Sequence, residues 1–340
     1  MGARLARKAP SLPGYVDVIE AAYDVEARPD AWLVRLAELT CKLVPDGRIG
    51  IAYAFDYREP EAPVFSDIAV ANAPAGFARQ LKTVLGSLRS AEALTVEAIH
   101  VGPRVGPAAT LSEHLGVEGM KASATGRFLV ECDARDSFGC VAADPEGRGV
   151  VLSTDLPSVT RLGAATRRRW TQVAAHVAAA YRLRRRLRER ASTEAAILHP
   201  SGRLADAGSE AAMPMARQRL RDAVRAIDAA RTRAGRAAVD ESLALWKGLV
   251  AGRWSLVERF ESDGRRYFVA RRNDPDVPAP LALTRRERQI VGYAALGHPL
   301  KLIAYELGLS VSTVAGHRAS AMSKLGVRSL ADLASLRGAP

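Results

Sequence analysis

Apolar residues in the first 160 positions recur at intervals that predict helices packed on a sheet. Residues 29–43 have apolar side chains at helical spacing, and Pro-Asp-Gly at 45–47 ends that pattern. From 49 to 55 large apolar residues alternate with small ones, which predicts a strand whose small face lies under a helix. A further helix is expected near 75–88.

The remainder of this segment predicts a late β-hairpin. A Gly- and Pro-rich stretch at 102–107 is followed by residues 128–131 and then by the strand-like residues 138–143. Pro-Glu-Gly at 145–147 forms a turn into a second strand at 149–153.

A long amphipathic helix is predicted next, over residues 164–190. Its apolar positions are three, four or seven residues apart: Trp170, Val173, Val177, Ala180 and Leu187. Such a stripe is typical of a helix that pairs with a second copy of itself. We therefore expect residues 164–192 to connect two folded parts.

The pattern after this helix predicts a smaller α+β unit at 193–272. Two short strands surround Pro-Ser-Gly at 200–202, and residues 254–270 form a hairpin because Asp263-Gly264 favours a tight turn. Between them lies a helix with one apolar side, formed by Leu220, Val224 and Ile227. Three prolines and two aspartates at 273–280 predict a linker.

Basic residues exceed acidic ones by twelve, and they are concentrated in two segments. Residues 161–190 contain ten arginines and one acid, and residues 281–340 contain eight basic and three acidic residues. The excess indicates a polyanionic partner, either nucleic acid or anionic lipid. The arginine-rich helix is expected to present a solvated, self-repelling face, with nonspecific DNA contact as the alternative.

The last sixty residues carry the signals of a compact helical domain. Thr284 is placed as an N-cap with Glu287 three residues on, which predicts a capping box and a helix ending near Leu296. Gly-His-Pro at 297–299 separates it from a second helix, whose apolar side is Leu302, Ile303 and Leu307.

Gly308 ends this second helix, Ser310 caps a third, and a fourth begins at Ser329. Helix, short turn and helix is the arrangement that places one helix in the major groove of DNA. The motifs that carry a family resemblance are Leu-Thr-Arg-Arg-Glu-Arg at 283–288, Ile303-Ala304, Leu307-Gly308-Leu309-Ser310, Thr313-Val314, His317-Arg318 and Lys324-Leu325-Gly326-Val327-Arg328-Ser329.

With these motifs, residues 281–340 resemble the LuxR-type helix-turn-helix. The resemblance implies an all-α, four-helix domain that binds double-stranded DNA as a homodimer. It places the phosphate or groove contacts at Lys301, Ser312, Thr313, His317, Arg318 and Lys324. For His317, helix packing is the alternative to DNA contact. Val314, Ala321 and Leu325 are expected in the core.

The outward face of the expected recognition helix is unusual for this family. Ala315, Gly316 and Ala319 stand where members often carry basic or polar side chains, so we expect modest direct base readout. Gly316 either permits close approach to the DNA backbone, or it is a substitution without a role in binding that the helix tolerates.

Upstream, residues 15–163 resemble a GAF-type sensory domain and residues 193–272 a PAS-like unit, both through the order of their elements. The expected fold class is therefore multidomain α+β with a sheet-and-helix sensory region followed by the all-α domain. An unidentified small-molecule or protein signal would shift the long helix and change dimer geometry.

Other functional classes have no motif in this chain. We expect no catalytic residue, metal site or identifiable cofactor, because nucleotide-binding, metalloprotease and hydrolase motifs are missing and the three cysteines are widely spaced. No apolar run predicts a membrane span or signal peptide, so a cytoplasmic regulator is expected. The alternative function is a protein-interaction scaffold with a degenerate helix-turn-helix.

Overall fold

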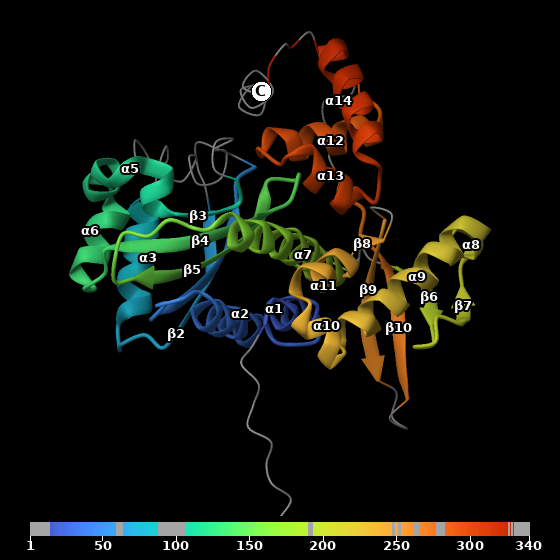
Figure 1. The fold of residues 1–340 in the computed structure, drawn as a ribbon, viewed down its shortest axis with the longest axis horizontal. Helices are drawn as coiled ribbons and strands as arrows, with labels where there is room; N and C mark the ends of the chain where they lie inside the picture. The colour runs from blue at the N-terminus through green and yellow to red at the C-terminus, as the bar shows by residue number, and fades with distance from the viewer. Residues whose placement is uncertain are drawn as a thin grey trace, which may run out of the picture.

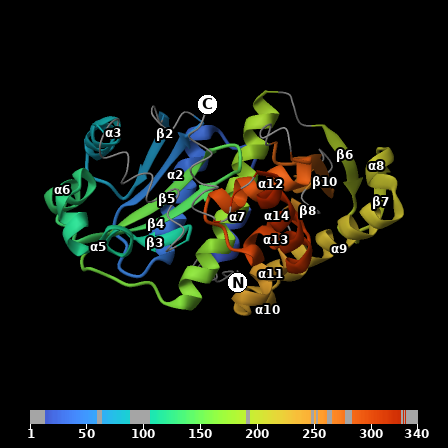
Figure 2. The ribbon, with the colours of Figure 1, turned by 90° about the horizontal axis from the view of Figure 1, so that it is seen from above.

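The computed structural model describes residues 14–58, 64–87, 106–189, 193–246, 249–250, 253–260, 265–276, 283–325, 327 and 329. Figure 1 shows two sheets toward opposite ends of the long axis and a group of helices above them. Helix α7 (Ala164–Arg188) crosses between the two sheets, as Figure 2 shows from above.

The first sheet is antiparallel, with strand order β2-β1-β5-β4-β3. Its strands are β1 (Gly50–Asp56), β2 (Val64–Ala71), β3 (Ala108–Thr110), β4 (Asp136–Ala143) and β5 (Arg148–Leu156). The small face of β1 lies under α2 (Pro29–Leu43), which confirms that prediction. At Gly50 an added Cβ would lie 2.2 Å from the Ala37 carbonyl oxygen, so only glycine allows this approach.

Four further helices are described in this part: α1 (Tyr15–Ala22), α3 (Phe77–Ser87), α5 (Leu111–Ala122) and α6 (Ala124–Glu131). The helix near 75–88 and the β4–β5 hairpin are confirmed. The predicted elements do not include α1, β2, β3 or α5. Residues 128–131 end helix α6 and do not join the sheet. Most of the Gly- and Pro-rich stretch lies outside the described residues.

The second sheet is also antiparallel, with strand order β7-β6-β10-β9-β8. Its strands are β6 (Glu194–Leu198), β7 (Leu204–Ala207), β8 (Leu249–Val250), β9 (Trp254–Phe260) and β10 (Arg266–Arg272). The accompanying helices are α8 (Ser209–Ala212), α9 (Pro214–Arg231), α10 (Arg233–Ala237) and α11 (Val239–Leu245).

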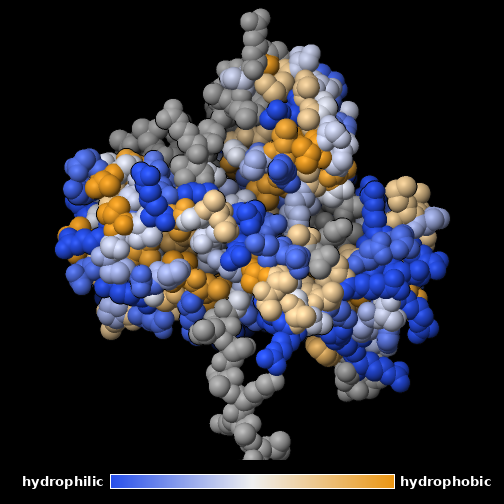
Figure 3. Space-filling model, viewed as in Figure 1, coloured by the Kyte–Doolittle hydropathy of each residue, from blue (hydrophilic) through white to orange (hydrophobic). Residues whose placement is uncertain are grey.

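The expected elements of this second part are confirmed. Leu220, Val224 and Ile227 of α9 are buried against the sheet, and β9 pairs with β10 as a hairpin. The opposite side of α9 is hydrophilic and contributes to the polar surface on the right of Figure 3. The Asp263-Gly264 turn lies outside the described residues.

The apolar stripe of α7 is buried within its own chain. Trp170, Val173, Val177 and Ala180 are fully buried, and the Trp170 ring lies 5.5 Å from that of Tyr15. One continuous apolar cluster extends from α1 and α2 through α7 to α9 and the second sheet. The expectation that these four positions pair with a second copy is therefore wrong, because elements far along the same chain cover them.

Two of the arginines in the last turns of α7, Arg182 and Arg184, are buried and do not form a solvated face. Arg184 donates hydrogen bonds to the carbonyl oxygens of Asp24 and Ala27, and its guanidinium lies 4.6 Å from the Trp32 ring centre. Arg182 is also fully buried. Both expected roles of this segment, a repelling face or a DNA contact, are therefore corrected for these two arginines.

Part of the predicted linker is packed against the core. Asn273 is fully buried, and its side-chain amide donates to Ala179 O and to Ser255 Oγ, both at 2.8 Å. Asp274 is buried beside it. The Pro-rich composition therefore ends strand β10 at this point, but residues 273 and 274 stay packed against the core and do not form an exposed linker. Residues 277–280 of the predicted linker lie outside the described part.

Replacing Arg184 tests whether the arginines of α7 stabilise the folded protein through contacts within the chain. Arg184→Gln removes two charge-assisted hydrogen bonds and a ring contact, so we expect it to lower the free energy of unfolding by about 2–4 kcal/mol. Arg79→Gln, at an exposed site on α3, should change it by less than about 0.5 kcal/mol. Thermal unfolding of the full chain measures both. Equal effects from the two variants would contradict the internal role.

Candidate nucleic-acid interface

The C-terminal part contains α12 (Arg285–Ala295), α13 (Leu300–Leu307) and α14 (Val311–Leu325). The predicted capping box is present, because Thr284 Oγ1 accepts from Glu287 N while Glu287 Oε2 accepts from Thr284 N. Gly308 ends α13 at φ +61°, a conformation that favours glycine. Ser310 Oγ accepts from Thr313 N at 3.0 Å and caps α14 as expected.

A small apolar core holds these three helices together. Ile290, Ile303 and Leu307 pack against Val314 and Ala321 of α14. The burial of Val314 and Ala321 confirms their predicted core role, and Leu325 is half-buried against the same cluster. The predicted fourth helix from Ser329 lies outside the described residues.

The expected contact residues lie mainly along one exposed surface of α14. Figure 1 shows α14 at the outer edge of the helical group, while α13 contacts α7. Exposed positions are Ser312, Thr313, Gly316, Ala319 and Lys324, together with Lys301 on α13. Ala315, His317 and Arg318 are half-buried. Their contact roles remain predictions.

Lys324 has a partner inside the domain. Its Nζ lies 2.9 and 2.8 Å from the two carboxylate oxygens of Glu287, which also accept a hydrogen bond from Ser320 Oγ. Hydrogen bonds from Lys324, Ser320 and Thr284 lower the pKa of Glu287 to about 2. Glu287 therefore joins the start of α12 to the end of α14. Sequence reasoning identified its capping role and missed this second one.

The three arginines in the first turns of α12 also have partners. Arg285 pairs with Asp274 at 2.6 Å, Arg286 donates to Gln289 Oε1, and Arg288 donates to the Leu283 carbonyl oxygen. Arg318 has no side-chain hydrogen bond or ion pair with another described residue, and its position on α14 leaves it available to a ligand. The extent of direct base readout stays a prediction.

The remaining helix, α13, faces the rest of the protein. The Tyr305 hydroxyl lies 2.5 Å from His176 Nε2 of α7 and within hydrogen-bond distance of Leu243 O and Trp246 O. Leu296, at the end of α12, packs beside an apolar cluster of the first sheet. No local sequence signal marks these contacts, because their partners lie far away along the chain.

The described ranges contain neither a side-chain arrangement that could hold a metal ion nor a helix that could span a membrane. No group of three or more His, Cys, Asp or Glu side chains there is arranged to hold a metal ion. Within those ranges no helix combines the length and apolar character that a membrane span requires.

Comparison with known proteins identifies the helical part. Residues 281–336 match the family described as "Bacterial regulatory proteins, luxR family". These residues are a LuxR-family helix-turn-helix domain. The transcriptional regulatory protein UhpA is 48% identical over 66 residues in Escherichia coli and 47% identical over 66 residues in Salmonella typhimurium. The transcriptional regulatory protein FixJ of Rhizobium meliloti is 44% identical over 59 residues.

These matches are confined to one part of each protein. The UhpA matches cover 18% of this chain and 34% of UhpA, and the FixJ match covers 17% and 29% respectively. The chain thus spans about a third of the length of the curated relatives it matches. Upstream, the architecture of helices and antiparallel sheets is established, while the GAF-like and PAS-like identities stay predictions.

The pKa of Glu287 provides a test of the hydrogen bonds by which this residue connects α12 to α14. A carboxyl whose pKa is lowered on folding stabilises the fold above its ordinary pKa of 4.5, and this contribution is lost as the pH falls toward about 2. Glu287→Gln should therefore speed amide exchange in α12 and α14 at pH 7, relative to wild type. The difference in domain stability should shrink between pH 4.5 and pH 2.5. A pH-independent difference would contradict this account, and Glu118→Gln on the exposed side of α5 is the control.

Proposed function

We propose that the protein is a DNA-binding transcription regulator whose upstream α+β region controls its LuxR-family domain. The observation that carries the proposal is the match of residues 281–336 together with the exposed surface of α14. The matched relatives UhpA and FixJ are both transcriptional regulatory proteins. In this proposal the protein acts in the cytoplasm as a homodimer and responds to a small-molecule or protein signal by changing dimer geometry.

The second candidate function is a protein-interaction scaffold with a degenerate helix-turn-helix. The neutral residues Ala315, Gly316 and Ala319 on the recognition helix favour it, as does the engagement of Lys324 by Glu287. Against it, Ser312 and Thr313 are exposed on the same helix, where their hydroxyls contact only Ser310 Oγ among the described residues, and Arg318 forms no ion pair there. Because phosphate contacts dominate DNA affinity, salt dependence separates the two functions.

Salt-titrated binding of the full-length protein to genomic DNA fragments tests the proposal. Wild type should bind a subset of fragments with a steep fall in affinity as salt rises. Arg318→Ala should weaken DNA binding about tenfold. It should also reduce the slope of log affinity against log salt concentration by about one, which corresponds to one lost phosphate contact. Arg79→Ala on α3 is the matched control and should bind like wild type. Absence of salt-sensitive binding by wild type to every fragment would overturn DNA binding and favour the scaffold.

Gly316 provides a test that separates stability from DNA contact. An added Cβ at this position meets no atom within 4 Å, so packing in the free protein does not require glycine. Gly316→Ala should stabilise α14 by up to about 1 kcal/mol. If the DNA backbone approaches here, the same methyl group should weaken DNA binding about tenfold. Thermal unfolding and DNA titration measure the two effects, and unchanged DNA affinity would show that the glycine is not at a close approach. Ser323→Ala, further along the exposed side of α14, is the control.

A further inference from the structure

We propose that Tyr305 and Glu146 hold the LuxR-family domain docked against the upstream part of the protein. We propose further that release of the domain from this docked position raises DNA affinity. The proposal rests on the proposed DNA-binding function and specifies how that function is regulated. It follows from three observations. The hydroxyl of Tyr305 on α13 forms hydrogen bonds to the rest of the protein, and buried polar atoms near this contact lack hydrogen-bond partners. The carboxylate of Glu146 joins the first sheet to the chain segment that leads into α12.

The contact at α13 is made by the half-buried side chain of Tyr305. Its hydroxyl has one proton and faces two carbonyl acceptors, Leu243 O at 2.8 Å and Trp246 O at 2.7 Å. Burial lowers the pKa of His176 to about 3, so this third neighbour is neutral near pH 7. Tyr305 therefore binds α13 to α7 and α11 through neutral hydrogen bonds, which break without separating charges.

Near this contact, the interface leaves polar atoms unsatisfied. Arg182 is fully buried, and its two terminal nitrogens have no hydrogen-bond partner. The hydroxyl groups of Tyr23, directly after α1, and of Tyr293 on α12 are also buried in this region. Such groups cost free energy as long as water is excluded, and separation of the domain from α7 would hydrate them. The docked position is therefore less favourable than its apolar contacts alone would make it.

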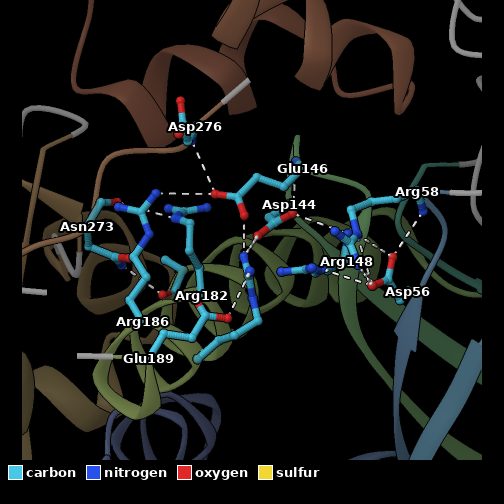
Figure 4. A network of polar contacts seen from close by, with 12 residues as sticks. Asp56, Arg58, Asp144, Glu146, Arg148, Arg182, Arg186, Glu189, Asn273 and Asp276 are labelled. Carbon is cyan, nitrogen blue, oxygen red and sulfur yellow. Dashed lines mark hydrogen bonds and ion pairs between the residues drawn. The ribbon is translucent and has the colours of Figure 1, made fainter. Parts of the chain in front are cut away.

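Glu146 connects this interface to the first sheet. It lies in the turn between β4 and β5, and its carboxylate accepts hydrogen bonds from Arg185 and Arg186 of α7. The same carboxylate accepts a hydrogen bond from the backbone N–H of Asp276 at 3.2 Å. Figure 4 shows Glu146 between the arginines and the segment that carries Asp276. One side chain of the sheet thus holds both the long helix and the chain leading to α12.

The segment beyond this contact transmits the restraint to α12. Asp274 accepts a hydrogen bond from Arg285 at 2.6 Å, and the Gln289 side chain donates to Pro275 O at 2.8 Å. Residues 274–276 are therefore fixed by the β4–β5 turn at one end and by the first turns of α12 at the other. A displacement of this turn by a signal at the first sheet would loosen the domain.

Opening should raise DNA affinity because two DNA-binding domains must align with two half-sites. A domain fixed on its own α7 has one orientation, and only the released fraction adopts the orientation that DNA selects. Apparent affinity scales with the fraction of molecules in the competent state. Weakening the dock increases that fraction without changing any residue on α14.

Hydrogen exchange of the full chain tests the dock directly, without DNA. Tyr305→Phe and Glu146→Gln should each increase amide exchange about tenfold in α13 and in residues 265–276, while exchange in α14 stays at the wild-type rate. Tyr267→Phe on β10 and Glu118→Gln on α5 are matched controls that should leave exchange unchanged. Wild-type exchange at α13 in both dock variants would overturn the proposal, as would a parallel increase in α14, which would indicate unfolding of the domain.

DNA titration of the same proteins completes the test. Both dock variants should bind the selected fragments about tenfold more tightly than wild type. Equal or weaker binding by variants that show increased exchange at α13 would overturn the regulatory inference. If wild type and all variants fail to bind DNA, the proposed function fails, and the exchange results still decide whether the domain is docked.

Discussion

Burial of α7 is the constraint on which the rest of the structure depends. The helix contacts the first sheet, α1, α11, β9 and α13, so the α+β parts and the LuxR-family domain pack against the same helix. Its burial also removes arginines from water, and a buried guanidinium is costly unless acceptors surround it. The carbonyl oxygens of Asp24, Ala27 and Asn273 and the carboxylate of Glu146 supply acceptors, although Arg182 remains incompletely paired.

The helix-turn-helix domain was predictable from sequence because its signals are local. The Thr284 capping box, the left-handed Gly308 and the Ser310 cap each involve residues within about one helical turn. The role of α7 was not predictable in this way. The acceptors of Arg184 and Arg185 lie between 39 and 160 residues away along the chain, and helical periodicity reports which side is apolar without identifying what covers it.

The count of arginines along the sequence did not predict, for the same physical reason, which of them face solvent. The ten arginines in residues 161–190 dominate the sequence count, yet several of them are enclosed or paired. By contrast, Arg217, Arg219 and Arg225 of α9 are exposed and form no ion pair with the described residues. They come from a stretch outside the two basic segments. The charge that a partner meets is therefore set by which carboxylates and carbonyls the fold brings to each arginine, and a running sum along the sequence cannot report it.

The composition of α14 explains why the proposed docking of the domain would have a large effect on DNA affinity. With alanine and glycine on its outward face and Lys324 held by Glu287, one domain has few groups for base or phosphate contacts. In the proposed homodimer, useful affinity then depends on two domains binding together, because a second linked contact multiplies a weak first one only when the geometry permits both. Under this proposal, contacts that orient each domain control binding more strongly than they would for a domain with a highly basic recognition helix. The polar interface at α13, away from the surface of α14 proposed to face DNA, would suit this control, because a change there would alter the orientation of the domain and leave the residues of α14 unchanged.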